Sequence, residues 1–129
     1  TDWSLFDGSP GEDCCHNGKA VGNPEGPVYV IPYDFDNAGL INAEYAVPSE
    51  ILPIRRVTTR LYRGLCRLNA EVGVALDELG RQQDRLIAIF DSDVIDENAR
   101  ERAVRFIEGS FEVINDPDER QAEIYERCR

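Results

Sequence analysis

One segment constrains this chain more than any other: the run from Val28 to Asp36, which reads VYVIPYDFD. Its β-branched and aromatic residues are typical of a buried strand. Because side chains alternate across an extended backbone, Asp34 and Asp36 are predicted to share one side, about 6–7 Å apart, while Phe35 anchors the other side in a core. Such a carboxylate pair suits a divalent cation. A polar turn after the strand is the alternative, because Asp is common in turns.

A second strand is predicted over residues 18–21, separated from the strand at 28–33 by a loop rich in Gly and Pro. Two short strands joined in this way form a β-hairpin with a longer than minimal connection. Residues 37–53 then show little periodicity. That stretch is long for a structureless loop, which favours a functional role.

The second half of the chain has helical periodicity. Its apolar stripes are Val57, Leu61, Leu65 and Leu68; then Val72, Leu76, Leu79, Leu86 and Phe90; and then Ala99, Ala103, Phe106, Ile107, Phe111 and Ile114. Asp96 is a predicted N-cap. Asp116, Pro117 and Glu119 form a start signal for a last helix that should run to about Cys128. We expect these stripes to form the core.

These patterns predict an α+β fold in which a hairpin and loop region, residues 1–53, packs on a C-terminal helical bundle, residues 54–129. The chain has 129 residues, which is enough for one domain with a modest core. With 42% hydrophobic and 30% charged residues, it is typical of a globular protein rather than a disordered one.

The formal net charge of −11 argues against nucleic acid or an anionic membrane as the main partner. No stretch approaches the roughly 20 apolar residues of a membrane span. The chain contains no methionine, so we expect that it is not a primary translation product as written. The lack of a signal peptide therefore says nothing about export.

Four cysteines occur, Cys14, Cys15, Cys66 and Cys128, at a spacing that fits no zinc signature. Adjacent cysteines rarely bond to each other. One or both of Cys14 and Cys15 are therefore expected to reach Cys66 or Cys128 in an oxidising compartment, which favours a periplasmic or extracellular protein. Buried free thiols in a cytosolic protein are the alternative.

Polar residues flank the predicted hairpin. His16 and Asn17 come just before its first strand, and a hairpin brings its two strand ends together, so Asn17 should lie near Asp36. An amide oxygen and one or two carboxylates make a hard-ligand metal site with positions open for phosphate oxygens. A separate carboxylate such as Asp2 could orient or deprotonate an attacking hydroxyl. The plainer alternative for His16 is a hydrogen bond to backbone near the hairpin.

The order of Asp2, then His16-Asn17, then a hairpin ending in Pro32-Tyr33-Asp34-Phe35-Asp36 resembles the catalytic half of atypical protein-kinase-like enzymes. The CotH-type and HipA-type kinases are the nearest families. CotH-type sequences end the corresponding strand in a Pro-aromatic-Asp-x-Asp run, which residues 32–36 match. The chain is also similar to the C-terminal part of a set of bacterial, exported proteins.

The resemblance implies the C-lobe of a kinase-like fold, with Asp2 as catalytic base. It further implies that Asn17 binds a metal and that Asp34 or Asp36 holds the Mg²⁺ or Mn²⁺ that bridges ATP phosphates. The chain departs from the family in three ways. The gap between Asp2 and Asn17 is long, so that Asp13 competes for the role of base. There is also neither a Gly-rich phosphate loop nor a strand lysine that could bind the nucleotide.

The chain is therefore expected to be the metal-binding part of a phosphotransferase that lacks its nucleotide-binding lobe and is inactive without it. Its partners would be a nucleotide in the intact parent and an unknown phosphate acceptor. The alternative is a non-catalytic exported domain that keeps a kinase-like fold and is stabilised by disulfides.

Overall fold

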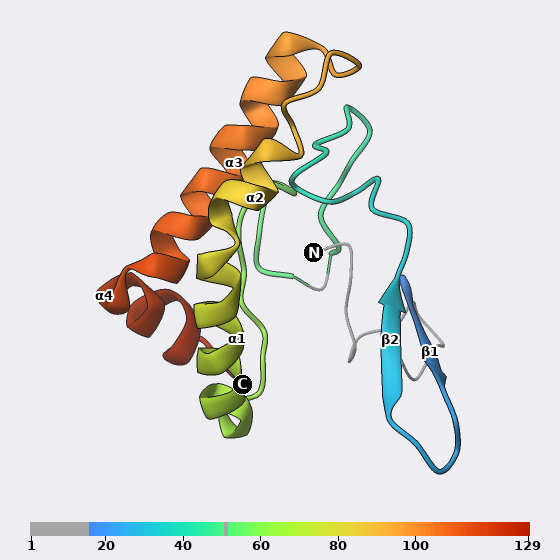
Figure 1. The fold of residues 1–129 in the computed structure, drawn as a ribbon, viewed down its shortest axis with the longest axis vertical. Helices are drawn as coiled ribbons and strands as arrows, with labels where there is room; N and C mark the ends of the chain where they lie inside the picture. Colours follow the sequence, from blue (N-terminus) through green and yellow to red (C-terminus); the bar gives the residue numbers. More distant parts are fainter. Residues whose placement is uncertain (1–15, 51) are drawn as a thin grey trace. The chain divides into compact units, whose positions relative to one another are not determined.

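The computed structural model describes residues 16–50 and 52–129 (Figure 1). It confirms a mixed α and β chain, with a two-stranded antiparallel hairpin in the first half and helices in the second. The backbone divides into two compact units, residues 1–60 and 61–129. The packing of the hairpin on the helices and the boundary after residue 53 stay predictions.

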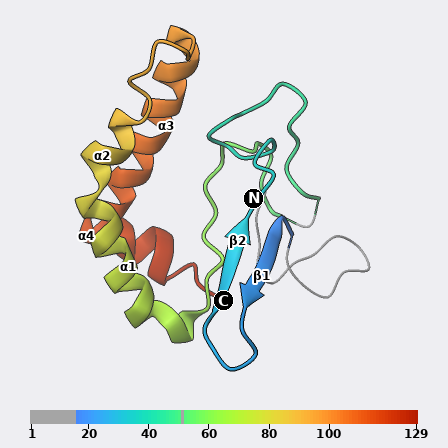
Figure 2. The same cartoon turned by 45° about the vertical axis from the view of Figure 1, so that its right-hand side comes forward.

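The hairpin consists of β1 (Gly18–Gly22) and β2 (Val28–Pro32), whose register runs from Gly18 opposite Pro32 to Gly22 opposite Val28 (Figure 2). This confirms the predicted strand pair. The prediction of a buried strand is wrong, because Tyr29 is 63% exposed and Ile31 is 52% exposed. In a sheet of two strands each strand has only one neighbour, so β-branched residues here reflect pairing rather than burial.

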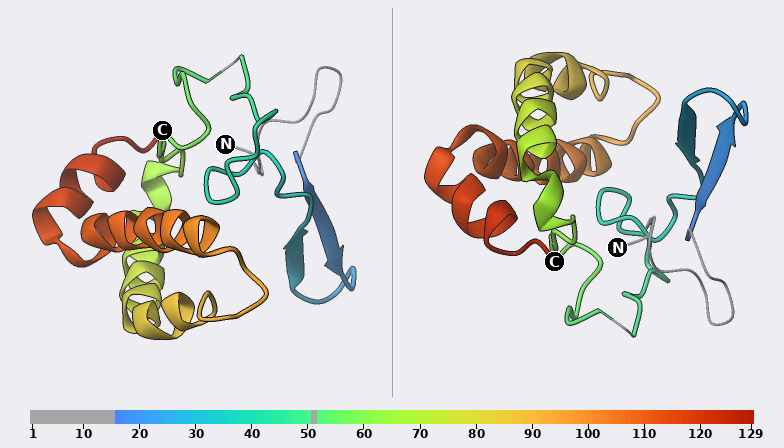
Figure 3. Two further views of the ribbon diagram at one scale, coloured as in Figure 1. Left: turned by 90° about the horizontal axis from the view of Figure 1, so that it is seen from above. Right: turned by 90° about the horizontal axis from the view of Figure 1, so that it is seen from below.

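The second unit is helical. Its elements are the 3₁₀ turn η1 (Cys66–Leu68), α1 (Asn69–Arg81), α2 (Gln83–Ala88), α3 (Glu97–Asn115), α4 (Pro117–Arg120) and the π turn η2 (Gln121–Tyr125). The long helix α3 contacts α1, α2 and α4, and both views in Figure 3 show it crossing the α1–α2 pair. The core of this unit contains Ala103, Phe111, Ile114 and Ile124. Three of these belong to the stripe predicted for α3.

Both predicted helix starts are confirmed. The Asp96 carboxylate accepts a hydrogen bond from the Ala99 amide at 3.1 Å. The Asp116 carboxylate accepts from the amides of Asp118 and Glu119 at 2.8 and 3.1 Å, with Pro117 in the first helical turn. Each cap satisfies amide groups that a helix start leaves without an intrahelical partner.

Three helix predictions need correction. The stripe from Val57 to Leu68 is not a helix: only η1 forms there, and the chain before it is irregular. The stripe from Val72 to Phe90 is divided between two helices, since the chain breaks at Gln82, and Phe90 lies beyond the end of α2. The last helix does not reach Cys128. It gives way after α4 to the π turn, in which the Glu126 amide donates to the Gln121 carbonyl at 3.0 Å.

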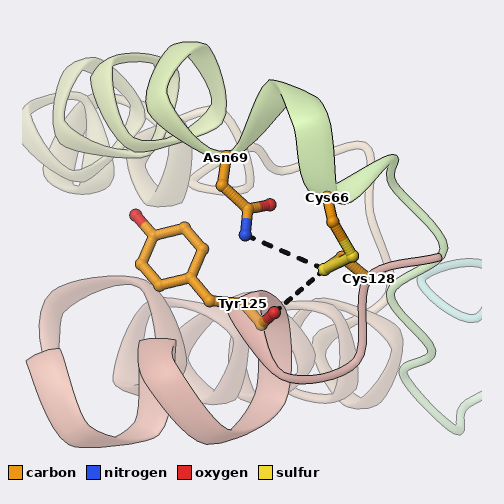
Figure 4. The surroundings of a disulfide bond; sticks show 4 residues. All are labelled: Cys66, Asn69, Tyr125 and Cys128. Carbon is orange, nitrogen blue, oxygen red and sulfur yellow. Dashed lines mark hydrogen bonds between the residues drawn. A yellow bond between two sulfur atoms is a disulfide. The ribbon is translucent and has the colours of Figure 1, made fainter.

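Cys66 and Cys128 form a disulfide with each other, with their Cα atoms 4.9 Å apart (Figure 4). The prediction that Cys14 or Cys15 reaches one of them is therefore wrong; Cys14 and Cys15 lie outside the described residues. Backbone hydrogen bonds reinforce the link, because the Cys66 amide donates to the Arg129 carbonyl at 3.1 Å and the Arg129 amide donates to the Gly64 carbonyl at 2.9 Å. This pairing holds the chain before η1 extended, where a helix was predicted.

Two polar contacts surround the disulfide (Figure 4). The Asn69 amide nitrogen lies 3.8 Å from Cys128 Sγ, and the Tyr125 carbonyl oxygen lies 3.0 Å from the same sulfur. The disulfide therefore ties η1 and the start of α1 to the chain that follows η2. Among the described residues, no helix is long and apolar enough to cross a membrane.

Candidate functional site

The open end of the hairpin brings together the residues that precede β1 and those that follow β2. Two hydrogen bonds continue the ladder beyond the strands. The Tyr33 amide donates to the Asn17 carbonyl at 2.9 Å, and the Asn17 side-chain nitrogen donates to the Asp34 carbonyl at 3.0 Å. Asn17 is thus in direct contact with Asp34, which is another of the predicted metal ligands. Its amide oxygen is the side-chain atom with the chemistry of a cation ligand.

Both residues of this contact adopt the left-handed backbone conformation, with φ of 51° at Asn17 and 55° at Asp34. Asn and Asp enter this region more readily than other residues with a Cβ atom, and they do so mostly in turns. The regular pairing of the two strands ends beside these two left-handed residues. The backbone changes direction at both of them, so the hairpin ends where the acidic run begins.

The backbone that carries the acidic side chains differs from the prediction. β2 ends at Pro32, and the left-handed Asp34 interrupts the extended backbone, so strand alternation does not place Asp34 and Asp36 on one side. Phe35 is 48% exposed and does not anchor the strand end in a core. A turn follows at once, in which the Ala38 amide donates to the Phe35 carbonyl at 2.9 Å.

Asp36 connects the strand end to the long irregular loop. Its carboxylate accepts a hydrogen bond from the Asn37 side chain at 2.9 Å, and the Asn37 side-chain oxygen accepts from the Val47 amide at 3.3 Å. The carboxylate also accepts a hydrogen bond from the Tyr45 hydroxyl, and this bond is the main reason that the pKa of Tyr45 is raised above its ordinary value of 10.0. The charge of Asp36 adds to this, because it disfavours a phenolate nearby.

Two residues near this end were missed in the sequence. Tyr45 bonds to Asp36 across nine positions of irregular chain, a distance over which no periodicity applies. Lys19, the only lysine, has its ammonium group 5.2 Å from the centre of the Tyr33 ring. That contact is a cation–π interaction between β1 and the residue that follows β2, and the strand pairing itself could have indicated it.

Of the remaining predicted site residues, the structure describes only His16. Asp2, assigned as catalytic base, and its competitor Asp13 lie outside the described residues. His16 is half-buried immediately before Asn17. Residues 16–50 and 52–129 contain no group of three or more His, Cys, Asp or Glu side chains that could hold a metal ion.

The predicted ligands Asn17, Asp34 and Asp36 would supply an amide and two carboxylates. All their ligand atoms are hard oxygens, the chemistry that suits Mg²⁺ and Mn²⁺. The Asn37 amide orients the carboxylate of Asp36 in the way that outer-shell groups orient metal ligands. With so few protein ligands, a bound ion would keep several waters or take oxygens from a phosphate.

In comparisons with known proteins, no protein-family model, no curated protein and no solved structure matches this chain.

Proposed function

We propose that the open end of the hairpin is the metal-binding end of a kinase-like phosphotransferase, with Asn17, Asp34 and Asp36 as ligands for Mg²⁺ or Mn²⁺. The chain would then correspond to the C-lobe of the kinase-like fold, and Asp2 would serve as the catalytic base. The metal, when bound, would neutralise nucleotide phosphate charge. The residues of the chain would position the metal and accept the proton of the acceptor hydroxyl.

The observation that supports this proposal is the hydrogen bond from the Asn17 side chain to the Asp34 carbonyl. In the resemblance on which the proposal rests, a metal-binding Asn is followed by a strand and then by a metal-binding Asp. The hydrogen bond brings an Asn and an Asp together at such a position. The bond between Asn37 and Asp36 adds support, since an oriented carboxylate loses less conformational freedom on binding a cation.

Mn²⁺ titration of the ¹⁵N-labelled chain tests the proposal, because a bound paramagnetic ion broadens the amide resonances nearest to it. Broadening should begin at Asn17 and at residues 33–37. Asp34→Asn and Asp36→Asn should each weaken Mn²⁺ binding at least about tenfold. Since the sequence carries no Gly-rich phosphate loop, Mg²⁺–ATP should bind this chain weakly in isothermal titration.

Glu44→Gln is the matched control, because Glu44 is an exposed carboxylate in the same loop and is not among the proposed ligands. If it weakens Mn²⁺ binding as much as Asp34→Asn does, the ion responds only to the overall acidity of the chain. The proposal fails in that case, and it also fails if broadening begins on the helices.

A second candidate is a non-catalytic exported domain that keeps a kinase-like fold. The disulfide between Cys66 and Cys128 favours this candidate, because such bonds persist in oxidising compartments. It predicts that Asp34→Asn and Asp36→Asn leave the function of the parent protein intact, whereas a phosphotransferase would lose activity with either change. Mass measurement before and after thiol alkylation of protein purified from its native compartment would test for export.

A further inference from the structure

The helical unit has an open hollow between α2 and the first turns of α3, with a volume of about 560 Å³. Its apolar lining includes Ile87 and Phe90 from the α2 side and Val104 from α3. Acidic side chains also line it: Asp84, Asp91 and Glu101. An apolar surface bordered by carboxylates differs from the mixed, evenly charged surface expected of a helix pair that faces only water.

The charge of this hollow is only partly balanced from within. The single basic residue in its lining, Arg100, lies with Nη1 3.5 Å from a carboxylate oxygen of Asp91. Glu101 pairs with Arg105 at 3.2 Å on the exposed face of α3. Asp84 makes no ion pair with any residue in the described part of the chain. The hollow therefore has an excess of negative charge beside an apolar surface.

The chain that joins α2 to α3 exposes further apolar side chains. Ile89 is 64% exposed and Val94 is 91% exposed. In sequence, Ile89 directly precedes Phe90, which lines the hollow, and Val94 lies three residues after Asp91. A small free cation would leave these side chains in water, whereas an extended segment that continues past the hollow would cover them.

We propose that this hollow binds a cationic, amphipathic peptide segment in which Arg or Lys alternates with aliphatic residues. The aliphatic side chains would pack on Ile87, Phe90 and Val104, and a basic side chain would pair with Asp84 at the border. Long basic side chains suit such a surface because their stems are apolar while their charged ends remain in water. The net charge of −11 would speed the approach of such a segment without fixing where it binds.

A fluorescein-labelled pentapeptide of alternating leucine and arginine, titrated with the full chain and followed by fluorescence anisotropy, tests the proposal. Two further probes separate its two requirements: one has glycine in place of leucine, and the other has glutamate in place of arginine. The parent peptide should bind saturably, and both altered peptides should bind at least about fivefold more weakly. Amide shift changes in the ¹⁵N-labelled chain should map to residues 84–91 and 100–104.

Three variants of the chain should change the affinity for the peptide in different ways. Asp84→Asn should weaken binding about two- to fivefold, as expected for the loss of one partly exposed ion pair. Arg100→Gln should strengthen it by a similar factor, because it removes the competing cation and releases Asp91. Glu108→Gln is the matched control: it makes the same charge change on α3, outside the hollow, and should leave binding unchanged.

The proposal is overturned if Asp84→Asn and Glu108→Gln act alike, since binding would then follow net charge alone. It is equally overturned if the glycine probe binds as well as the leucine probe, or if Arg100→Gln weakens binding. Circular dichroism of each variant separates these outcomes from a loss of folding.

Discussion

The guanidinium group of Arg120 on α4 donates to the carboxylate of Asp77 on α1 at 2.7 Å. The same group donates from Nε and Nη2 to the Ile114 carbonyl at 2.9 and 2.5 Å, near the end of α3. Hydrogen bonding to Asp77 is the main reason that the pKa of Arg120 is raised above its ordinary value. One largely buried side chain thus joins three helices of the second unit.

Arg120→Met should destabilise the chain by about 1–3 kcal/mol, because it leaves the Ile114 carbonyl without these donors. Asp77→Asn should cost less, within about 1 kcal/mol, since the Asp77 carboxylate is 58% exposed and water replaces its partner. Urea unfolding followed by circular dichroism measures both. Arg105→Met is the control, because its exposed pair with Glu101 within α3 should contribute under about 0.5 kcal/mol. Equal losses for the two Arg variants would contradict this account.

The disulfide closes a loop with a sequence separation of 62, from Cys66 to Cys128. Loop-closure entropy for a ring of that size corresponds to about 4 kcal/mol in the unfolded state. The double variant Cys66→Ser, Cys128→Ser should lose stability of that order in urea unfolding without reductant. Reductant should then lower the stability of the wild-type chain more than that of the double variant. Equal stability of the two proteins would show that the pair is not formed in solution.

The caps differ in the number of amides that they satisfy. Asp116 accepts from two amides and Asp96 from one, so Asp116→Ala should destabilise the chain more than Asp96→Ala does, with about 1 kcal/mol typical of one cap. Asp93→Ala, an exposed carboxylate before α3, serves as the control. Thermal unfolding by calorimetry would rank the three, and the opposite order for the two caps would refute the geometry.

The elements that the sequence predicted correctly are those with local signals. The predictions were wrong where contacts between residues distant in sequence determine the structure. The hairpin follows from strand residues on both sides of a Gly- and Pro-rich loop, and Asp96 and Asp116 carry their cap chemistry in the side chain itself. The break at Gln82 has no such local signal. Next to it, the Asn115 side chain on α3 donates to that of Gln83 at 2.8 Å, a contact 32 residues away in sequence that periodicity cannot indicate.

The same division holds at the candidate site. Hairpin geometry predicted that Asn17 meets the acidic run, because residues that flank paired strand ends lie close together. The predicted neighbour was Asp36, whereas the hydrogen bond in the structure is to the Asp34 carbonyl. The strand was predicted to run to residue 33, one residue past its observed end at Pro32, although a proline with Asp two residues later is a stop signal. The bond between Tyr45 and Asp36 could not be predicted, since it depends on how the irregular loop folds back.

That bond gives a prediction about pH. Hydrogen bonding to the Asp36 carboxylate favours the protonated hydroxyl of Tyr45, so the folded-state pKa of Tyr45 lies above its ordinary value of 10.0. A group with a raised folded-state pKa stabilises the fold at pH values below its unfolded pKa and loses that contribution as pH rises through the folded-state pKa. The bond should therefore hold the loop near neutral pH and release it only in alkali.

Absorbance at about 295 nm reports phenolate formation, and the difference between wild-type and Tyr45→Phe titration curves isolates Tyr45. Its midpoint should lie above 10, and Asp36→Asn should lower it by removing both the charge and the better acceptor. Tyr62 makes the comparison specific: its pKa is also raised, but chiefly by burial, so Asp36→Asn should leave its titration unchanged. If Asp36→Asn does not change the Tyr45 midpoint, the loop does not close on the strand end in solution. The proposed metal site would then lack the Asp36 carboxylate in its oriented position.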